Sequence, residues 1–241
     1  MKKTLAIVMS LCMGAVLCAC SSSAAADTKG EGVMTYEEYA NAALDSEVVV
    51  ETYVQAHQSW WEDQITCYTQ DKDGGYFIYN MACSEEDAAT LTPGTKIKVK
   101  GYKSEWSGET EITDATFEVE DGSYVAEAID LTASLGKDDE LIKNQNMFVT
   151  FKGLTVEAAN DNGDAFLYNW DGSGSQGDDI YFNVSYNGAT YTFTVESYLC
   201  GSDTEVYKAV EGLKVGDTID VEGFLYWYEG AQPHVTSVTV K

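Results

Sequence analysis

The side chains of this chain best suited to ligand binding are large aromatic rings that fall in a few short, turn-like segments. Flat rings stack on sugars and on nucleobases, and each stacked base contributes about 1–3 kcal/mol. The same rings could instead cover the ends of β-barrels or the interface between two repeated units, where they fill core, and that alternative stays open at this point. The candidate binding residues are Trp60, Trp61, Trp106, Trp170, Tyr226, Trp227 and Tyr228.

One acidic segment has the alternating oxygen side chains of some calcium-binding loops. It lacks the terminal Glu and the central glycine placement of an EF-hand, so a solvated loop is the default expectation and calcium the alternative. We expect no other cofactor, because the cysteines and histidines show no spacing typical of zinc ligands. The candidate calcium ligands are Asp171, Ser173, Ser175, Asp178 and Asp179.

Little in the sequence indicates catalysis. The two histidines are His57 and His234, and neither stands beside a recognisable Ser or Cys nucleophile motif. Carboxylates are so abundant that no acid–base pair can be singled out. We therefore predict a protein without enzymatic activity.

The charge of the chain argues against a phosphate-rich partner. Without Lys2 and Lys3, 12 lysines remain against 40 Asp and Glu residues, which places the net charge near −28, and there is no arginine. Nucleic-acid sites depend on Lys and Arg clusters. The one basic stripe is the segment 96–103, with four lysines. It is typical of a solvated strand face, and contact with an anionic ligand is the alternative.

The amino terminus predicts where the folded part is delivered. Lys2 and Lys3 precede an apolar run from Leu5 to Leu17, too short to span a bilayer comfortably but typical of a secretory signal peptide. Residues 17–20, Leu-Cys-Ala-Cys, resemble the lipobox of bacterial lipoproteins. That resemblance implies cleavage before Cys20, a diacylglycerol on its thiol and an extracytoplasmic protein anchored to a membrane. The alternative is an ordinary signal peptide cut within residues 24–26.

Downstream of the tether, β-branched and aromatic segments alternate with turn signals, so strands should dominate. Residues 35–38 fit a helix capping box, and a short helix should precede the first strand. A second helix should begin at Ser84, between the third and fourth strands. The predicted strands of this first unit are 47–56, 65–70, 75–81, 95–103 and 111–119.

The same order of elements recurs in the second half. Residues 91–106 and 213–228 share Leu, Gly, Ile, Val and Gly at matching positions, each followed by aromatic residues. Residues 147–158 parallel 47–56, and Asn187-Gly188 marks a hairpin. We expect a second helix-capping position at Ser202, and an insertion of fifteen to twenty residues after the first strand of the second copy. The predicted organisation is signal peptide 1–19, lipidated tether 20–33, first barrel with its helix 34–126, linker 127–145 and second barrel 146–241.

Five strands with a helix between the third and fourth are similar to the OB-fold, a small Greek-key barrel. Leu213, Gly216, Asp217, Ile219 and Val221, with Gly223, match the L-x-x-G-D-x-[IV]-x-V-x-G pattern of OB modules in bacterial extracellular proteins. The fold class implied is mainly β, with two tandem five-stranded OB-type barrels. OB modules bind ligands on the face of strands two and three, near the loops that hold the aromatic residues.

These observations lead to a functional expectation. We expect a membrane-anchored, extracytoplasmic, non-catalytic binding module whose ligand is an oligosaccharide or a protein. The first alternative is a nucleic-acid-binding protein, which the OB resemblance suggests and the charge disfavours. The second is a structural or assembly component of the cell envelope.

Overall fold

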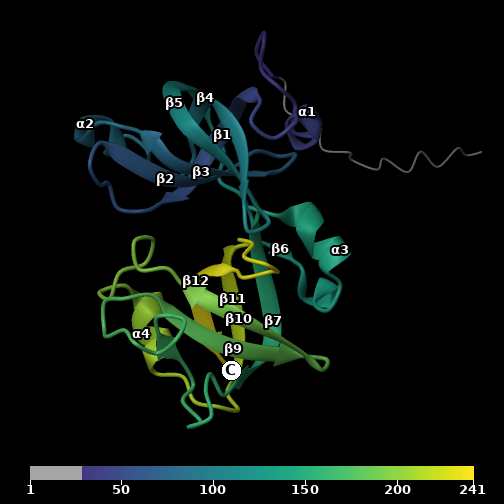
Figure 1. Ribbon diagram of the computed structural model, residues 1–241, viewed down its shortest axis with the longest axis vertical. Helices are drawn as coiled ribbons and strands as arrows, with labels where there is room; N and C mark the ends of the chain where they lie inside the picture. The colour runs from purple at the N-terminus through teal and green to yellow at the C-terminus, as the bar shows by residue number, and fades with distance from the viewer. Residues whose placement is uncertain (1–28) are drawn as a thin grey trace, which may run out of the picture.

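The computed structural model describes residues 29–241. The predicted signal peptide, Cys20 and most of the tether lie outside the described residues. Within the described part, no helix is both long and apolar enough to cross a membrane. The chain forms two barrels stacked along the long axis of the molecule, with the carboxyl terminus in the second (Figure 1).

The first barrel follows helix α1 (Tyr36–Asn41), which begins with the predicted capping box: the Thr35 side chain accepts from the backbone N–H of Glu38, and the Glu38 carboxylate accepts from that of Thr35. Its five strands close in the order β1-β2-β3-β5-β4, and β1 pairs with β4 to complete the circle. Helix α2 (Glu85–Ala88) lies between β3 and β4 and is capped by Ser84. The strands are β1 (Glu47–His57), β2 (Gln64–Gln70), β3 (Gly75–Ala82), β4 (Thr95–Trp106) and β5 (Glu109–Ser123).

The second barrel repeats that topology. Its strands follow the order β7-β11-β12-β10-β9, and an antiparallel β7–β9 pairing closes the circle. Helix α4 (Glu205–Glu211) lies between the third and fourth strands, as predicted, but its cap is Thr204 and not Ser202. The strands are β7 (Phe148–Glu157), β9 (Ile180–Tyr186), β10 (Ala189–Val195), β11 (Thr218–Phe224) and β12 (His234–Val240), with β8 (Leu167–Tyr168) paired to β9 at the edge. Two five-stranded barrels with a helix in the third connection confirm the predicted OB-type fold class.

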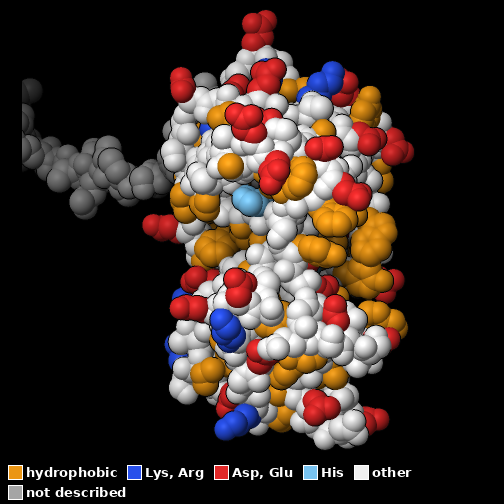
Figure 2. Space-filling view, turned by 90° about the vertical axis from the view of Figure 1, so that its left-hand side faces the viewer, with side chains coloured by type: hydrophobic (Ala, Val, Ile, Leu, Met, Phe, Trp, Pro, Cys, Tyr) orange, Lys and Arg blue, Asp and Glu red, His pale blue; other side chains and the backbone are white. Residues whose placement is uncertain are grey.

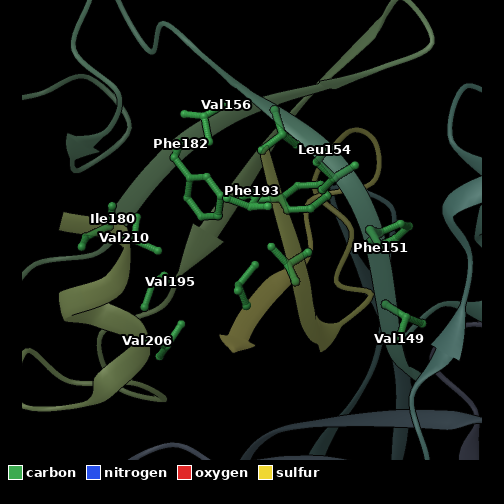
Figure 3. Packing of buried hydrophobic residues seen from close by; sticks show 14 of the residues in the cluster. Val149, Phe151, Leu154, Val156, Ile180, Phe182, Phe193, Val195, Val206 and Val210 are labelled. Atoms are coloured by element: carbon green, nitrogen blue, oxygen red, sulfur yellow. The ribbon is translucent and has the colours of Figure 1, made fainter. Parts of the chain in front are cut away.

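Alternation along the strands builds the core of the second barrel. Inward positions hold Phe151 on β7, Phe182 on β9 and Phe193 on β10, all at most 1% exposed. The Phe193 ring lies 5.5 Å from that of Phe151 and 6.1 Å from that of Phe182 (Figure 3). Tilted and edge-on ring pairs of this kind add about 0.5–1.5 kcal/mol each to the burial of the rings.

The segment that joins the barrels is structured and belongs to the second one. Strand β6 (Ile129–Asp130) pairs in parallel with β7, and three short helices follow: η1 (Thr132–Ser134), α3 (Asp138–Leu141) and η2 (Ile142–Asn144). Leu131, Leu135 and Leu141 of this segment are buried in the core of the second barrel. The connection therefore packs beside the junction between the barrels (Figure 1).

A small aromatic cluster joins the two barrels. Tyr68 and Phe77, from the first barrel, are buried against Phe224 of the second. The rings of Tyr68 and Phe224 are stacked, with centroids 4.7 Å apart. Hydrophobic side chains gather at the waist between the two lobes of the surface (Figure 2).

Hydrogen bonds across the junction fix the relative position of the barrels. The backbone N–H of Phe148 donates to the Gln70 side chain at 2.7 Å, and the Asn146 side chain donates to the backbone carbonyl of Thr110 at 2.9 Å. The backbone N–H of Trp227 donates to the buried carboxylate of Glu109 at 2.8 Å. Because these bonds satisfy backbone groups of both barrels, the junction is a specific interface rather than a flexible link.

Candidate functional site

A cleft of about 840 Å³ lies between the barrels and opens to the surface. This volume is within the range typical of small-molecule and cofactor sites. Seven of its lining residues are Phe, Tyr or Trp, three are acidic, and the remaining four are Gln, Thr or His. The lining residues are Gln58, Phe77, Tyr79, Trp106, Glu111, Trp170, Asp179, Tyr181, Thr194, Glu196, Tyr226, Tyr228, Gln232 and His234.

The second barrel supplies the floor of the cleft from its second and third strands. Phe193 and Val195 on β10 point into the core, so the alternate residues Thr194 and Glu196 point outward and line the cleft. Tyr181 on β9 lies directly opposite Thr194. This outer face of strands two and three is the face that OB modules use for ligands.

The first barrel supplies the opposite wall. Phe77 and Tyr79 project from the same side of β3, with ring centroids 6.4 Å apart, and Glu111 on β5 pairs with Phe77 in parallel register. Trp106 ends β4, and its ring lies 5.2 Å from that of Tyr228, in the β11–β12 connection of the second barrel. Rings from both barrels therefore meet at the rim of one cleft.

His234 anchors the inner end of the cleft. Its imidazole stacks on the Tyr226 ring at 4.1 Å, and Nδ1 lies 2.6 Å from the hydroxyl of Tyr68. Burial lowers the pKa of His234 to about 3, so the ring is neutral at ordinary pH. A neutral imidazole held by an aromatic stack and one hydrogen bond is a fixed part of the wall.

The cleft is lined by three acidic side chains and by no cationic one. Burial, with the nearby Asp179, raises the pKa of Glu196 to about 7, although the backbone N–H groups of Tyr198 and Leu199 donate to it at 3.2 and 2.7 Å. Burial also raises the pKa of Glu111. Since none of the lining residues is a lysine, no positive side chain offsets these acids within the cleft.

Four of the seven aromatic residues predicted to bind a ligand line the cleft: Trp106, Trp170, Tyr226 and Tyr228. Trp106 is 55% exposed and Trp170 76% exposed, so both rings are accessible from solvent. Their convergence was not evident in the sequence, because they come from the β4–β5 turn, the β7–β9 insertion and the β11–β12 connection.

The other three predicted residues lie elsewhere. Trp227 packs at the junction, where a Cβ on Gly108 would come within 2.8 Å of its ring. The indole N–H of Trp60 donates to the backbone carbonyl of Cys83 at 2.9 Å, which ties the β1–β2 loop to the end of β3. Trp61 is 68% exposed but is not among the residues that line the cleft.

The acidic 171–179 segment uses its carboxylates to order its own backbone. Asp171 accepts from the N–H of Ser173, Asp178 from that of Ser175, and Asp179 from the N–H and hydroxyl of Ser197. Across residues 29–241, no group of three or more His, Cys, Asp and Glu side chains is arranged to hold a metal ion. Asp179 lines the cleft, whereas the other four candidate ligands are not among its lining residues.

Three of the four lysines in the 96–103 stripe make contacts within the protein. Lys96 forms ion pairs with Glu51 and Glu120 at 2.8 and 2.9 Å, and Lys100 pairs with Glu47 at 2.9 Å. The Lys103 ammonium is buried and donates to the carbonyls at the end of α1 at 2.7–3.2 Å, which corrects the expectation of a solvated face at that position. A lysine at a helix carboxyl terminus satisfies carbonyls that lack helical partners.

Reasoning from sequence missed the strand residues of the cleft: Tyr79, Tyr181, Thr194, Glu196 and Glu111. For all of them except Glu111, outward alternation along 75–81, 180–186 and 189–198 was the available signal, because it places residues on the ligand-binding face of an OB barrel. The docking of one barrel on the other decides which of them face a cleft, and no local pattern encodes that.

No protein-family profile matches this chain, and no curated protein matches it. Among solved structures it is similar to the Ifi202 HINa domain in complex with 20 bp dsDNA, with a TM-score of 0.35 and 11% identity over 81% of this chain and 98% of that one. A murine DNA-binding protein bound to dsDNA gives a TM-score of 0.36 and 12% identity over 80% and 94%. The p204 HINb domain gives a TM-score of 0.33 and 11% identity over 79% of this chain and 95% of that one. Similarities at this level carry no inference about the ligand of this chain.

Proposed function

We propose that this chain is a non-catalytic, membrane-anchored, extracytoplasmic binding protein whose inter-barrel cleft takes an oligosaccharide. The observation that carries the proposal is the cleft itself, which combines aromatic rings from both barrels with polar and acidic groups. Sugar rings present flat C–H faces to aromatic side chains and hydroxyls to carboxylates and amides. A cleft with Trp106 and Trp170 at its margin and Gln58 and Gln232 among its lining supplies both kinds of contact.

The electrostatics of the cleft favour a neutral or cationic ligand over a polyanion. Nucleic-acid binding rests on lysine and arginine contacts to phosphates, and the lining includes neither. The chain as a whole carries a net charge of −26, which disfavours the approach of a polyanion. Nucleic acid remains the principal competing ligand to be tested, because OB barrels of other proteins bind it.

The location is proposed from the amino-terminal sequence. Lys2, Lys3 and the apolar run that follows support secretion, and the Leu-Cys-Ala-Cys segment supports lipidation at Cys20. Cleavage before Cys20 would leave the fifteen residues 21–35 between the lipidated cysteine and α1, which suits a short tether that holds the barrels near a membrane surface.

Tryptophan fluorescence during titration tests the proposed ligand class. The purified protein is titrated with neutral oligosaccharides and with single-stranded and duplex DNA, each at low and at moderate salt. We expect a saturable change with an oligosaccharide that is insensitive to salt. A DNA response that collapses as salt rises would overturn the oligosaccharide proposal in favour of nucleic acid.

Single substitutions localise the response. Trp106→Ala and Trp170→Ala remove accessible rings from the cleft, and each should weaken oligosaccharide binding by roughly fivefold to a hundredfold. Trp61→Ala is the matched control, since it removes an equally exposed indole outside the cleft and should leave affinity unchanged. Silence of the wild-type protein to every sugar and nucleic acid would direct attention to a protein partner in the cell envelope.

A further inference from the structure

The floor of the cleft holds a buried polar group without a partner. Thr194 is 1% exposed, and its hydroxyl oxygen makes no hydrogen bond among the described residues. It lines the cleft together with Glu196, the residue that follows β10, and lies opposite Tyr181 on β9. An unsatisfied buried hydroxyl is unfavourable, so a hydrogen-bonding group of a ligand at this depth would be stabilised.

Three carboxylates, from both barrels, line the same cleft as this hydroxyl. Glu196 comes from the end of β10, Asp179 from the residue before β9, and Glu111 from β5 of the first barrel. Glu196 and Glu111 are both buried, and no lysine lines the cleft. Partly desolvated carboxylates without a cationic partner are costly to keep ionised, and a positive group on the ligand would remove that cost.

Aromatic faces complete a site for a positive group. Tyr226, Tyr228 and Trp106 lie on the lining with those carboxylates, and the Trp106 and Tyr228 rings are tilted toward one another at 41°. Ammonium groups are attracted to the faces of Trp and Tyr rings, and more strongly where water is excluded. Rings and carboxylates in one concave site therefore recognise a cation attached to an otherwise uncharged body.

We propose that the cleft selects oligosaccharides that carry free, protonated amino groups over their neutral N-acetylated counterparts. The ammonium of an amino sugar lies between the Glu196 and Glu111 carboxylates, and the sugar rings lie against the aromatic residues at the rim. Thr194 hydrogen-bonds to the bound sugar. This inference rests on the proposed oligosaccharide-binding function and names the chemistry that the same cleft prefers.

Isothermal titration calorimetry with a matched ligand pair tests the preference. The wild-type protein is titrated with the β-1,4-linked tetramer of glucosamine and with the same tetramer fully N-acetylated, at pH values on both sides of the raised pKa of Glu196, about 7. We expect the amine form to bind roughly tenfold more tightly or better. Equal affinities, or tighter binding of the N-acetylated form, would overturn this inference while leaving oligosaccharide binding in place. Binding of neither form would count against the proposed function itself.

Two isosteric variants assign the preference to the cleft. Glu196→Gln and Glu111→Gln keep the size of each side chain and remove its charge, and each should reduce the ratio of affinities toward one. The Glu196 carboxylate also accepts hydrogen bonds from two backbone N–H groups, so its replacement could disturb the local backbone. Glu111→Gln tests the role of charge without that complication. Glu85→Gln, on the exposed face of α2, removes the same unit of charge far from the lining and should preserve the ratio. An equal fall in Glu85→Gln would show that the preference comes from the overall charge of the protein and would overturn the assignment to the cleft.

Discussion

The hydroxyl of Tyr68 in the first barrel lies 2.6 Å from Nδ1 of His234 in the second, and both side chains are buried. The two residues are 166 positions apart in the chain. His234 also lines the cleft and stacks on Tyr226. One hydrogen bond thus links the junction that holds the barrels together to the wall of the candidate site.

Replacing Tyr68 with Phe should weaken the junction. The imidazole Nδ1 of His234 would lose its partner in a buried position, which costs about 1–3 kcal/mol. Urea unfolding measures the change in the free energy of unfolding. Tyr102→Phe, at an exposed position on β4, is the matched control and should change stability by less than about 0.5 kcal/mol. Equal effects of the two variants would show that the Tyr68–His234 bond contributes nothing.

Gly75→Ala should force the barrels apart. A Cβ on Gly75 would come within 2.6 Å of the backbone nitrogen of Met147, at the start of the second barrel. Backbone cannot move away as a flexible side chain can, so we expect a loss of about 1–3 kcal/mol in stability. Gly212→Ala is the control, because Gly212 has φ −86° and its nearest neighbour would lie 3.4 Å from the new Cβ. The measurement is the melting temperature of the wild type and of both variants. An unchanged melting temperature for Gly75→Ala would contradict the close approach of Gly75 to the second barrel.

Glu109→Gln should flatten the dependence of stability on pH. Burial raises the pKa of Glu109 to about 8 from an ordinary value of 4.5. Between these values the folded protein keeps a proton that the unfolded chain releases, so the free energy of unfolding falls as pH rises, by up to about 1.4 kcal/mol per pH unit. The stabilising contribution is complete below pH 4.5 and is lost as pH rises through 8.

Urea unfolding at several pH values from 5 to 8 measures that slope. The Glu109→Gln variant should lose less stability than the wild type over this range. Some dependence of stability on pH should remain in the variant, because the pKa of Glu196 is also raised, to about 7. Its ionisation likewise lowers the free energy of unfolding as pH rises. Parallel profiles for the wild type and Glu109→Gln would contradict a protonated Glu109 in the folded protein.

Cys20→Ala should release the protein from the membrane. The proposed lipid is attached to the Cys20 thiol, so its loss removes both lipidation and the cleavage that depends on it. Metabolic labelling with a radioactive fatty acid followed by fractionation is the measurement: the wild type should be labelled and sediment with membranes, whereas the variant should be unlabelled. An unlabelled wild type would favour the ordinary signal peptide cut within residues 24–26.

The barrels could be predicted because each is encoded by local patterns. Alternation and turn signals along 47–119 predicted the five strands of the first barrel and their succession along the chain. The Leu213–Gly223 motif identified β11 of the second barrel. The cap of α4 was placed two residues early, because both Ser202 and Thr204 are capping residue types and only Thr204 accepts from the N–H of Tyr207.

The candidate site was predictable only in part, for a different reason. Trp106 and Tyr228 were recognised from their positions in strand connections, but their approach to 5.2 Å depends on how the barrels dock. Docking is set by contacts such as Tyr68 with His234 and Asn146 with Thr110, between residues that share no sequence pattern. Trp60 and Trp61 are adjacent in sequence and were conspicuous candidates. They lie outside the cleft, because the docking of the barrels, which no local pattern encodes, decides which loops face it.

The measurement that tests the central claim most directly follows the five tryptophan indoles of the protein by NMR during titration with an oligosaccharide. Each indole N–H gives its own ¹H–¹⁵N signal, assigned by single substitutions. If the inter-barrel cleft is the binding site, the signals of Trp106 and Trp170 will shift in a saturable way, and those of Trp60 and Trp61 will stay in place. Shifts at Trp60 and Trp61 with Trp106 and Trp170 unmoved would contradict the account and move the site to the β1–β2 loop.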